Sequence, residues 1–435
     1  MKVAIIGAGF GGLSAAYFLS KAGADVTVFE SSDTPGGLAG GFLNKGWEWS
    51  LEHHYHHFFT NDDSVLGLAK EVGQNIIIAS PKSSTYFSDG VYQFDSPSTL
   101  LKFSKLSIFD RLRTGAVMAL LKAYPFWKPL EKTLSEKFIR SLMGKNSWKF
   151  IWEPLFVKKF GKYSSDINAA WFWARIYKRT MKLAYPEGGF LSLARKIENE
   201  IIKNGGRVLY NNLVTNLSLL TSVQQRNSHS GLTRILLTAS EKTYTFDKVI
   251  CTIPTDKFIE ITNGLPKNYT NKYMELKSLG AINLVISLKK GFLPGNTYWL
   301  NVNDLDYPFV SIVEHTNFMS ASHYNNEHLL YIGNYLPHNH KYFSYDANRL
   351  LKEFTPYLKK INNKFSAKMI KKVWVFKDKY AQPVVLKNHS KNIPKFTTPI
   401  SGLYLCNMQQ VYPWDRGTNY AVENGKKLAQ LILNG

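Results

Sequence analysis

The sequence predicts an α/β fold built around a doubly wound parallel sheet, and three observations support this prediction. The chain opens with a short apolar run from Val3 to Ile6, which is typical of a buried parallel strand. A glycine-rich turn follows, and then a stretch with apolar residues at helical spacing. A second apolar run, residues 25–29, ends on the acidic residue Glu30. Strand, turn, helix and second strand in this order predict a Rossmann-like βαβ unit.

The glycine-rich turn has the spacing Gly7-x-Gly9-x-x-Gly12, a fingerprint of dinucleotide binding. Gly7 permits the tight turn from strand to helix, Gly9 leaves room for a pyrophosphate, and Gly12 lets helix and strand pack closely. The free N–H groups and the positive end of the helix dipole would then meet the phosphates. Glu30 lies 18 residues after Gly12, where a carboxylate accepts hydrogen bonds from a ribose diol.

The apolar N-terminus has an alternative interpretation, a secretory signal peptide. It fails because glycines interrupt the apolar run and an acid-ended strand follows directly. The 435 residues provide enough core for two or three domains. No run approaches the roughly 18 apolar residues needed to span a bilayer. The two cysteines, Cys251 and Cys406, both end apolar strand-like runs. We therefore expect reduced core cysteines in a cytoplasmic protein.

The formal net charge of +22 is unevenly spread along the chain. Residues 101–182 carry 18 Lys and Arg against 5 Asp and Glu, and they hold five of the ten tryptophans. Such a surface fits nucleic acid, an anionic membrane or a phosphorylated ligand. No nucleic-acid-binding fold signature accompanies the charge, so we expect no nucleic-acid partner. A lysine-rich composition throughout the chain is the alternative explanation of the charge.

A second pair of glycines, Gly36 and Gly37, follows Glu30 by six residues. Together with the first turn and Glu30, this pair resembles the FAD fingerprint of a flavoprotein superfamily. Its members include amine oxidases, protoporphyrinogen oxidase, phytoene desaturases and UDP-galactopyranose mutase. The resemblance implies an FAD cofactor, with its pyrophosphate on the first turn, its adenosine ribose on the acid and its flavin near the second pair. The implied cofactor-binding residues of this segment are Gly7, Ala8, Gly9, Phe10, Gly11, Gly12, Glu30, Ser31, Gly36, Gly37 and Leu38.

A cluster of four histidines follows Glu52, and it invites a metal hypothesis: His53, His54, His56 and His57. No cysteine or carboxylate pair with ligand spacing accompanies them, so we expect no metal. In the superfamily a loop of the type Asp-x-Gly-x-His covers the flavin at this place. The sequence departs from that pattern, because Glu52 stands for the Asp and the Gly is missing. Residues 56–62 resemble a segment near the flavin in UDP-galactopyranose mutases.

The next part of the chain predicts short elements and then a long helical region. Residues 65–72 have the pattern of a short amphipathic helix, and residues 76–78 and 84–87 of strands. Asp89-Gly90 indicates a hairpin. From residue 98 to 182 apolar residues recur at helical spacing, and we interpret this region as a helical insert over the substrate side. Its apolar stripes are expected to be core, including Leu100, Leu101, Leu106, Ile108 and Leu112.

A second organised stretch begins at Gly188-Gly189, which opens a predicted helix that ends at Gly205-Gly206 before a strand at residues 207–210. This pattern also resembles the superfamily, where the chain re-enters the FAD domain and the residue matching Val214 packs its backbone against adenine. Strands are predicted at residues 213–220, 232–239 and 243–246, with a polar loop tip, TSVQQRNSHSG, between the first two. An apolar strand at residues 247–254 ends in proline. Further on we expect strands at residues 282–288, 309–313, 329–332 and 373–376, and a helix at residues 347–361.

The C-terminus predicts a strand at residues 403–406 and a helix that begins at Gly417-Thr418. Superfamily members end in this way, with a Gly-Asp pair at the ribityl chain and a helix N-terminus at the flavin pyrimidine, where the dipole stabilises negative charge. Here Cys406-Asn407 replaces Gly-Asp. The resemblance implies that Tyr412, Trp414, Asp415 and Arg416 lie beside the isoalloxazine, and a purely structural loop is the alternative. The further implied cofactor-binding residues are Val214, Asn407, Trp414, Gly417 and Thr418.

By this resemblance the fold is a doubly wound, Rossmann-like FAD-binding domain with an interrupted α+β substrate domain and a helical insert. The FAD-binding domain is expected to comprise residues 1–75, 185–265 and 395–435. The substrate domain is expected to comprise residues 76–184 and 266–394, with 98–182 as its helical, basic and aromatic-rich part.

The resemblance implies an FAD-dependent oxidoreductase of the amine oxidase and protoporphyrinogen oxidase type, in which an organic substrate passes a hydride to flavin N5. The expected partner is therefore a small molecule, either apolar or phosphorylated. No side-chain nucleophile is needed. The candidate catalytic residues, on position alone, are His54, His56, Tyr412 and Arg416.

Two other hypotheses stay open. The first is an isomerase like UDP-galactopyranose mutase, acting on a nucleotide sugar, with reduced flavin N5 as the nucleophile. Its diphosphate would need an arginine pair, for which Arg175 and Arg179, four apart on an expected helix, are the best candidates. The second is a peripheral contact between residues 101–182 and an anionic membrane, which is compatible with either activity.

Overall fold

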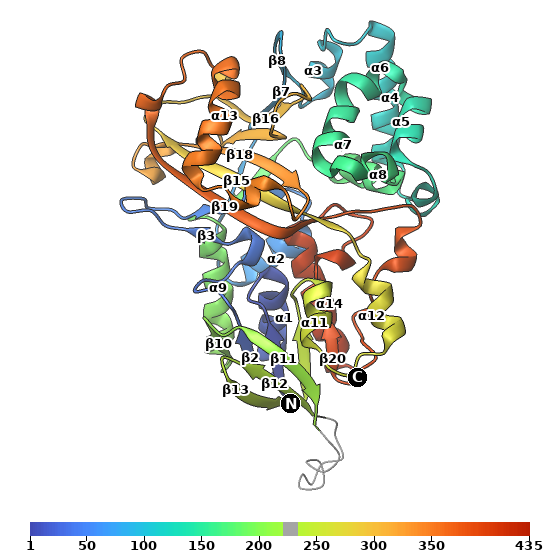
Figure 1. The fold of residues 1–435 in the computed structure, drawn as a ribbon, viewed down its shortest axis with the longest axis vertical. Coiled ribbons are helices and arrows are strands. Elements are labelled where there is room, and N and C mark those ends of the chain that lie inside the picture. The colour runs from blue at the N-terminus through green and yellow to red at the C-terminus, as the bar shows by residue number, and fades with distance from the viewer. Residues whose placement is uncertain (221–233) are drawn as a thin grey trace.

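The computed structural model describes residues 1–220 and 234–435, and its N-terminal part is built on a sheet of five parallel strands (Figure 1). The strand order is β10-β2-β1-β14-β20. These strands come from three separated segments of the chain: β1 (Lys2–Ile6), β2 (Asp25–Phe29), β10 (Arg207–Leu209), β14 (Lys248–Cys251) and β20 (Leu403–Leu405). The α/β prediction for this part is confirmed. The exact domain boundaries stay a prediction.

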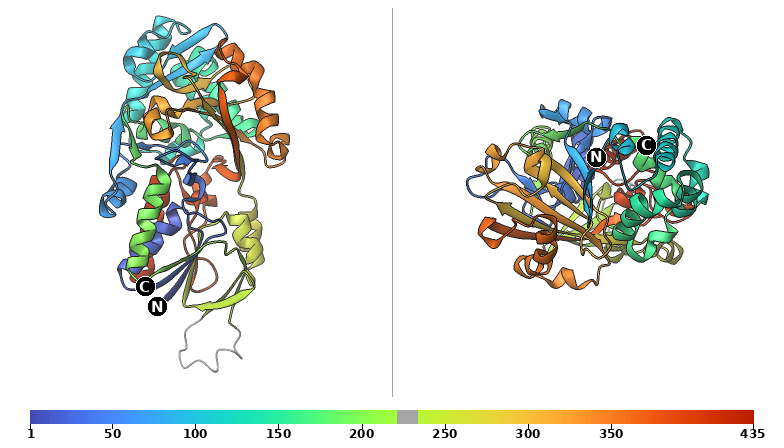
Figure 2. Two further views of the ribbon diagram at one scale, coloured as in Figure 1. Left: turned by 90° about the vertical axis from the view of Figure 1, so that its left-hand side faces the viewer. Right: turned by 90° about the horizontal axis from the view of Figure 1, so that it is seen from above.

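The alternation of side chains along β1 explains how the parallel sheet is covered. Val3 and Ile5 pack into a cluster with helices, whereas Ala4 and Ile6 pack against a small antiparallel sheet. The view from the side shows these layers on opposite faces (Figure 2). The covering elements are α1 (Phe10–Lys21), α9 (Phe190–Lys203) and α14 (Thr418–Leu433) on one face, and β11 (Val214–Leu219), β12 (Ile235–Ala239) and β13 (Lys242–Phe246) on the other. The predicted loop tip at residues 221–231 lies outside the described residues.

The second part of the molecule contains a seven-stranded sheet in the order β19-β15-β18-β17-β16-β7-β8. Helix α13 (Ala347–Ile361) covers one face of it, and the predicted hairpin at Asp89-Gly90 joins its last two strands. The strand at residues 297–302 was not predicted, because its sequence, TYWLNV, lacks the strict alternation of apolar and polar residues that indicates a half-buried strand. The strands are β7 (Lys82–Phe87), β8 (Gly90–Gln93), β15 (Ser278–Leu288), β16 (Thr297–Val302), β17 (Ser311–Glu314), β18 (His328–Leu336) and β19 (Ile370–Pro383).

The predicted helical region forms a separate bundle at the end of the molecule opposite the N-terminus (Figure 1). It is held by an aromatic cluster that includes Trp148, Trp152, Trp171 and Trp173. The expectation that its apolar stripes are core is only half right. Leu100 and Leu106 are buried, but three other stripe residues are exposed: Leu101, Ile108 and Leu112. The helices are α3 (Pro97–Leu101), α4 (Ile108–Ala123), α5 (Ser135–Met143), α6 (Lys145–Ser147), α7 (Glu153–Phe160) and α8 (Ala169–Lys178).

The remaining helices and strands are short. They comprise α2 (Asp63–Glu71), α11 (Thr255–Ile261), α12 (Lys267–Met274), β3 (Gly41–Phe42), β4 (Leu51–Glu52), β5 (Phe58–Phe59), β6 (Ile76–Ala79) and β9 (Leu183–Pro186). Among the residues that the structure describes, no helix is both long and apolar enough to cross a bilayer. Both cysteines are buried and unpaired, as the sequence predicts.

Candidate functional site: two connected cavities

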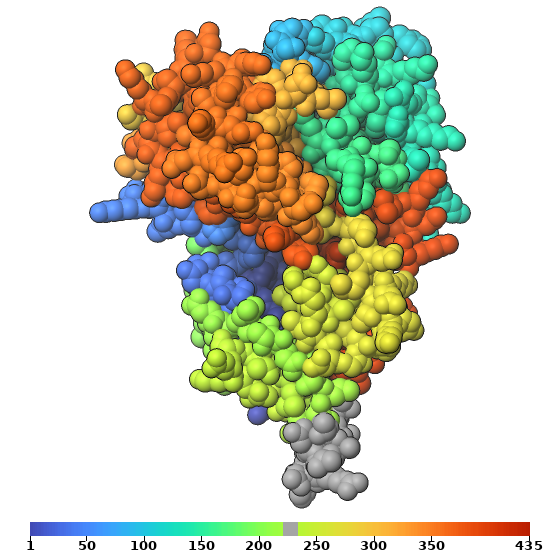
Figure 3. Space-filling view, viewed as in Figure 1, coloured from blue at the N-terminus to red at the C-terminus, as the bar shows by residue number. Residues whose placement is uncertain are grey.

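A cavity of about 410 Å³ lies between the parallel sheet and strand β19 of the larger sheet. The space-filling view shows the surface hollowed where the N-terminal segments face the α11–α12 region (Figure 3). Most of the cofactor-binding residues predicted from sequence line this cavity: Gly7, Gly9, Phe10, Gly11, Glu30, Ser31, Gly36, Gly37, Leu38, Val214, Asn407, Gly417 and Thr418. They come from all three segments assigned to the nucleotide-binding domain.

The first glycine turn has the close packing that its sequence spacing predicts. Gly7 has a φ of +102°, and a Cβ added there would lie 2.5 Å from Oγ1 of Thr252. Gly12 lies behind the turn and does not line the cavity. A Cβ at Gly12 would lie 2.0 Å from the carbonyl oxygen of Gly7. Gly12 is therefore required for packing of α1 on β1, while Gly7, Gly9 and Gly11 leave bare backbone at the cavity wall.

The two glycine turns pack directly on each other. The N–H of Gly36 donates to the carbonyl of Ala8 over 2.9 Å, and Gly9 and Gly36 form an isolated parallel bridge. Gly37, with a φ of +57°, is so close that an added Cβ would lie 3.1 Å from Cα of Gly9. The absence of side chains at Gly9, Gly36 and Gly37 therefore lets the two turns approach each other closely.

The carboxylate of Glu30 is fixed by backbone donors at the cavity wall. Its Oε2 accepts a hydrogen bond from the N–H of Ala8 over 2.6 Å, and its Oε1 accepts one from the N–H of Ser32 over 2.9 Å. Ala8 itself is buried and does not line the cavity. Oε1 also accepts from the hydroxyls of Ser31 and Ser32, so Oε2 is the carboxylate oxygen that keeps a free lone pair for a ribose hydroxyl.

Two helix N-termini converge on the cavity. Helix α1 begins at Phe10 and helix α14 begins at Thr418, and both residues line the wall. Their close packing depends on Gly425 in α14, where an added Cβ would lie 2.4 Å from the carbonyl oxygen of Gly11. The sequence analysis missed Gly425, since a helical glycine carries no local signal for the helix that crosses it. The paired N-termini favour an anionic ligand such as a pyrophosphate.

Asn407 lines the cavity, but its side chain is used within the protein. Its amide donates to the carbonyl of Ile253 over 2.9 Å and to Oγ1 of Thr255 over 3.0 Å, and its Oδ1 accepts from the N–H of Gln409. Both amide protons are therefore occupied. As an implied cofactor-binding residue, Asn407 can therefore offer a ligand only the remaining lone pair of its Oδ1.

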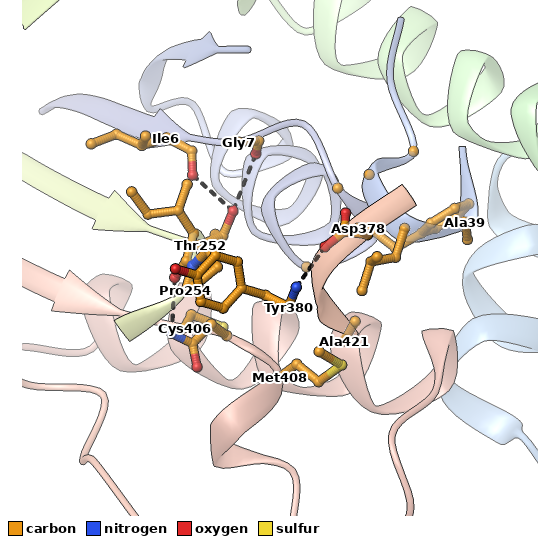
Figure 4. A pocket seen from close by; sticks show the side chains of 18 of the residues that line it. Ile6, Gly7, Ala39, Thr252, Pro254, Asp378, Tyr380, Cys406, Met408 and Ala421 are labelled. Carbon is orange, nitrogen blue, oxygen red and sulfur yellow. Dashed lines mark hydrogen bonds between the residues drawn. The ribbon is translucent and has the colours of Figure 1, made fainter. Parts of the chain in front are cut away.

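Strand β19 supplies wall residues that the sequence analysis did not single out. Figure 4 shows Tyr380 beside Thr252 and Pro254, and Asp378 on the side of Ala39. Asp378 Oδ1 accepts from the N–H of Tyr380 over 2.8 Å, and burial raises the pKa of the Asp378 carboxyl. Strand β19 belongs to the larger sheet, so only its tertiary placement brings these residues to the cavity.

Tyr412 and Trp414 lie away from the cavity, contrary to the expectation that they border the isoalloxazine. The hydroxyl of Tyr412 donates to Glu131 over 3.2 Å and accepts from Asn168 over 3.1 Å. Trp414 stacks on Tyr420 with a ring separation of 5.7 Å. Both aromatic side chains are partly buried against the aromatic cluster of the helical bundle.

The histidine cluster divides among different roles. His56 lies at the cavity wall, and its Nδ1 is 2.6 Å from the carbonyl oxygen of His54, so Nδ1 carries the proton and Nε2 is an acceptor. Burial, with the charge of Arg416, lowers the pKa of His56 to about 4. His54 lies in a small adjoining cavity, where its Nδ1 contacts the amide of Asn283. The neutral His56 is the better placed candidate base.

The other two histidines of the cluster and Glu52 do not face the cofactor cavity. His53 stacks on Phe376, and His57 contacts the hydroxyl of Tyr298 over 3.2 Å. The Glu52 carboxylate accepts hydrogen bonds from the Tyr185 hydroxyl and from the first N–H of α9, and burial raises its pKa to about 7. Within residues 1–220 and 234–435, no group of three or more His, Cys, Asp or Glu side chains is arranged to hold a metal.

A second cavity, of about 240 Å³, adjoins the first, and we refer to it as the basic chamber. The two cavities share the residues His56, Arg416, Gly417 and Thr418. The charged side chains that line the basic chamber are Lys159, Arg175, Lys178, Arg179, Arg416, Asp62, Asp95 and Asp415. Five basic groups face three acidic ones, and the chamber therefore favours an anionic ligand.

Asp415 lines the basic chamber and pairs with two of its basic residues. Its carboxylate pairs with Nζ of Lys159 over 2.8 Å, accepts from Nε1 of Trp171 over 3.1 Å and lies 3.6 Å from Nη1 of Arg175. Although burial acts to raise it, these cations with Arg416 hold the pKa of Asp415 well below its usual range. Burial lowers the pKa of Lys159 to about 7 despite this ion pair. Arg416 spans both cavities and donates to Gln382 and Tyr335.

The first cavity fits an FAD molecule. Bare glycine backbone and two helix N-termini face its middle, as a pyrophosphate needs. Glu30 and Val214 line it and would contact the ribose and the adenine. The flavin would lie at the part of the wall that this cavity shares with the basic chamber. When bound there, the flavin would supply a two-electron acceptor.

The family model of flavin containing amine oxidoreductases matches residues 10–433. Among curated proteins, the chain is similar to the carotenoid phi-ring synthase of Chlorobaculum tepidum, with 27% identity over 155 residues, or 34% of this chain and 24% of that protein. The chain thus spans about a quarter of the length of the curated carotenoid relatives that it matches.

Solved structures share the whole fold. A protoporphyrinogen oxidase-like protein from Exiguobacterium has a TM-score of 0.75 at 15% identity, and the match covers 100% of this chain and 99% of that one. Reduced UDP-galactopyranose mutase has a TM-score of 0.75 at 16% identity, covering 100% and 95%. At such identities these likenesses show the fold alone. The family model covers nearly the whole chain, and FAD is the cofactor that its cavity fits. This chain therefore belongs to the family of flavin containing amine oxidoreductases.

Proposed function

We propose that this protein is an FAD-dependent oxidoreductase that removes a hydride from a small organic substrate held in the basic chamber. Bound flavin supplies the hydride acceptor, its N5 atom. The observation that carries the proposal is the shared wall of the two cavities at His56, Arg416 and Gly417. A molecule in the basic chamber reaches the same wall as the cofactor.

The residues of the basic chamber would each contribute to binding and proton transfer. Arg175 and Arg179 would hold an anionic group of the substrate. His56, neutral and with Nε2 as an acceptor, would take the proton that the substrate releases when it loses a hydride. Trp299 and Tyr298 also line the chamber and would limit the entry of water. In this scheme Arg416 orients the substrate, and Tyr412 has no part, because it lies outside both cavities.

An anaerobic spectrum of the purified protein tests this proposal. We expect a yellow protein with absorbance maxima at about 370 and 450 nm, as for any oxidised flavin. Anaerobic addition of pooled organic amines, alcohols or total cell lipids should bleach the 450 nm band with at least one pool. Light-driven reduction is the control. If light bleaches the flavin and no pool does, the oxidoreductase proposal is wrong.

The isomerase alternative is less favoured, because the family model that matches the chain is that of amine oxidoreductases. One observation keeps it testable, since Arg175 and Arg179 both line the chamber where a diphosphate would lie. Turnover of a nucleotide sugar by the reduced protein only, with no net bleaching, would favour the isomerase.

We also propose that the helical bundle docks on an anionic membrane. An apolar rim of exposed side chains lies on this bundle and beside it: Leu101, Ile108, Phe109, Leu112, Leu120, Phe126 and Met181. The charge of residues 101–182 complements anionic lipid, since 18 basic side chains oppose 5 acidic ones. Phe109 is 67% exposed and Met181 69%, which is costly in water and favourable in a bilayer interface.

Liposome flotation tests this contact. The protein should float with vesicles that contain phosphatidylglycerol and not with pure phosphatidylcholine vesicles. The double change Ile108→Ser and Phe109→Ser should weaken binding about tenfold or more, because two apolar anchors are lost. Leu431→Ser is the matched control, since Leu431 is 46% exposed on α14, outside the bundle. Flotation by the double variant equal to that of the unchanged protein would contradict the proposal.

A further inference from the structure

A third cavity, of about 560 Å³, lies within the helical bundle, and we refer to it as the apolar chamber. Its walls come from α3, α4, α7 and α8 and from strands β7 and β16 of the larger sheet. The apolar residues that line it include Leu100, Leu112, Met118, Trp152, Leu155 and Ile176. Such a chamber favours a hydrocarbon chain.

The apolar chamber joins the basic chamber on one side and the apolar rim on the other. The residues that line both chambers are Asp95, Leu155, Arg175, Arg179, Thr180, Met181, Asn301 and Val310. Toward the surface, the lining of the apolar chamber includes Leu101, Leu112 and Met181 of the apolar rim. A continuous row of cavities therefore leads from exposed apolar side chains, past two arginines, to the wall of the cofactor cavity.

Arg179 differs from the other basic residues of the apolar chamber in having no protein partner. Arg111 donates to two backbone carbonyls, Lys122 donates to the carbonyls of residues 177 and 179, and Lys158 donates to those of Tyr307 and Phe309. In the part of the chain that the structure describes, no hydrogen bond or ion pair engages the Arg179 guanidinium. Arg179 lines both chambers.

Arg175 lies one helical turn before Arg179 and faces the same boundary. Burial and the charge of Arg175 lower the pKa of Arg179 to about 10, so the Arg179 guanidinium stays charged at neutral pH. Asp95 is the one acidic group common to the linings of the two chambers, and hydrogen bonds from Ser83, Gln93 and Thr99 engage its carboxylate. The guanidinium of Arg179 is thus free for a ligand.

We propose that the substrate is an amphiphile in which a small polar group is joined through an anionic linker, such as a phosphate, to an apolar chain. The polar group, which is the part oxidised, lies in the basic chamber beside the cofactor wall. The anionic linker binds Arg175 and Arg179 at the boundary, and the apolar chain fills the apolar chamber. The inference rests on the proposed function only in placing the reaction in the basic chamber.

Calorimetric titration of the flavin-loaded protein, without turnover, tests this arrangement. The probes are decyl phosphate below its micelle-forming concentration, inorganic phosphate and decanol. We expect decyl phosphate to bind about tenfold or more tightly than either of the other two, because only it engages arginines and apolar chamber together. The comparison of decyl phosphate with inorganic phosphate distinguishes a site for a lipid phosphate from a site for free phosphate. Equal affinity for decyl phosphate and inorganic phosphate would overturn the inference.

Two variants with matched controls separate the two halves of the site. Arg179→Gln should weaken decyl phosphate about tenfold and leave decanol unchanged, while Lys182→Gln, at an exposed site outside both chambers, changes neither. Ala119→Trp, on the chamber wall, should weaken decyl phosphate and decanol alike, whereas Ala123→Trp, one turn later and outside the lining, should not.

The outcomes distinguish this inference from the proposed function. If Arg179→Gln weakens both probes equally, or if Ala119→Trp weakens neither, the proposed amphiphile site is wrong whatever the flavin does. If binding follows the expected pattern but no substrate pool bleaches the flavin, the site stands and the oxidoreductase proposal fails. Because binding is measured without reduction, the two results are independent.

Discussion

Replacing Asp415 with alanine is expected to destabilise the folded protein by about 3 kcal/mol. The carboxylate is the shared partner of Lys159, Arg175 and the Trp171 indole, and its removal leaves Lys159 nearly buried without a counter-charge. Breaking a buried pair costs more than removing the whole pair, because the remaining charge stays desolvated. We take the lower end of the usual range, since the Asp415 side chain keeps 23% of its surface exposed to the chamber.

Thermal unfolding measures this effect. The midpoint should fall by roughly 5–10 °C, while Asp166→Ala, at an exposed site, should leave it unchanged. Adding Lys159→Met to Asp415→Ala should restore part of the loss, because the unpaired ammonium is removed with its partner. A midpoint for Asp415→Ala equal to that of the unchanged protein would show that the ion pair of Lys159 and Asp415 does not stabilise the fold.

Replacing Gly12 with alanine should abolish retention of FAD. The added Cβ would lie 2.0 Å from the carbonyl oxygen of Gly7 and 3.3 Å from a methyl of Ile5. The carbonyl belongs to the turn at the cavity wall, so relief of the clash must displace the backbone that faces the pyrophosphate. Overpacking of this kind costs about 1–3 kcal/mol in stability. The loss of the phosphate-binding turn adds to that cost.

The ratio of flavin absorbance to protein absorbance after purification gives the result directly. We expect a nearly colourless Gly12→Ala protein. Gly67→Ala is the control, because Gly67 lies inside α2 with no atom within 4 Å of an added Cβ, and alanine favours the helix by up to about 1 kcal/mol. Full flavin content in Gly12→Ala would mean that the turn tolerates the side chain and that the packing argument fails.

Local pattern was sufficient to predict most of the secondary structure and the nucleotide-binding turn. The first strand, the glycine spacing and Glu30 are close in sequence, and their geometry depends on backbone rules that act over a few residues. The helix at residues 347–361 matches α13 for the same reason, since its apolar spacing and its Asp346 cap lie within the segment itself.

The sequence pattern gave wrong predictions for side chains whose burial depends on which other element packs against them. Leu101, Ile108 and Leu112 fit a helical stripe, and the sequence alone could not show that nothing packs on this part of the stripe. Tyr412 and Trp414 follow the strand that leads to the flavin in the superfamily, but their rings turn to the helical bundle. Periodicity indicates which face of an element is apolar, and it does not indicate what lies opposite.

The sequence by itself determined the first βαβ unit and the FAD-binding turn, because both depend on residues that are neighbours along the chain. The family followed from the resemblance of such local motifs in three separated segments. Only the tertiary structure decided how the substrate region is built. Lys159 and Asp415 are 256 residues apart, and Asp378 reaches the cofactor cavity from the far sheet. Arg175 and Arg179 were plausible partners of a phosphate from spacing alone, but their position between a basic and an apolar chamber results from packing of α8 against elements distant in sequence. Such contacts follow from the burial of whole elements, and no local rule encodes them.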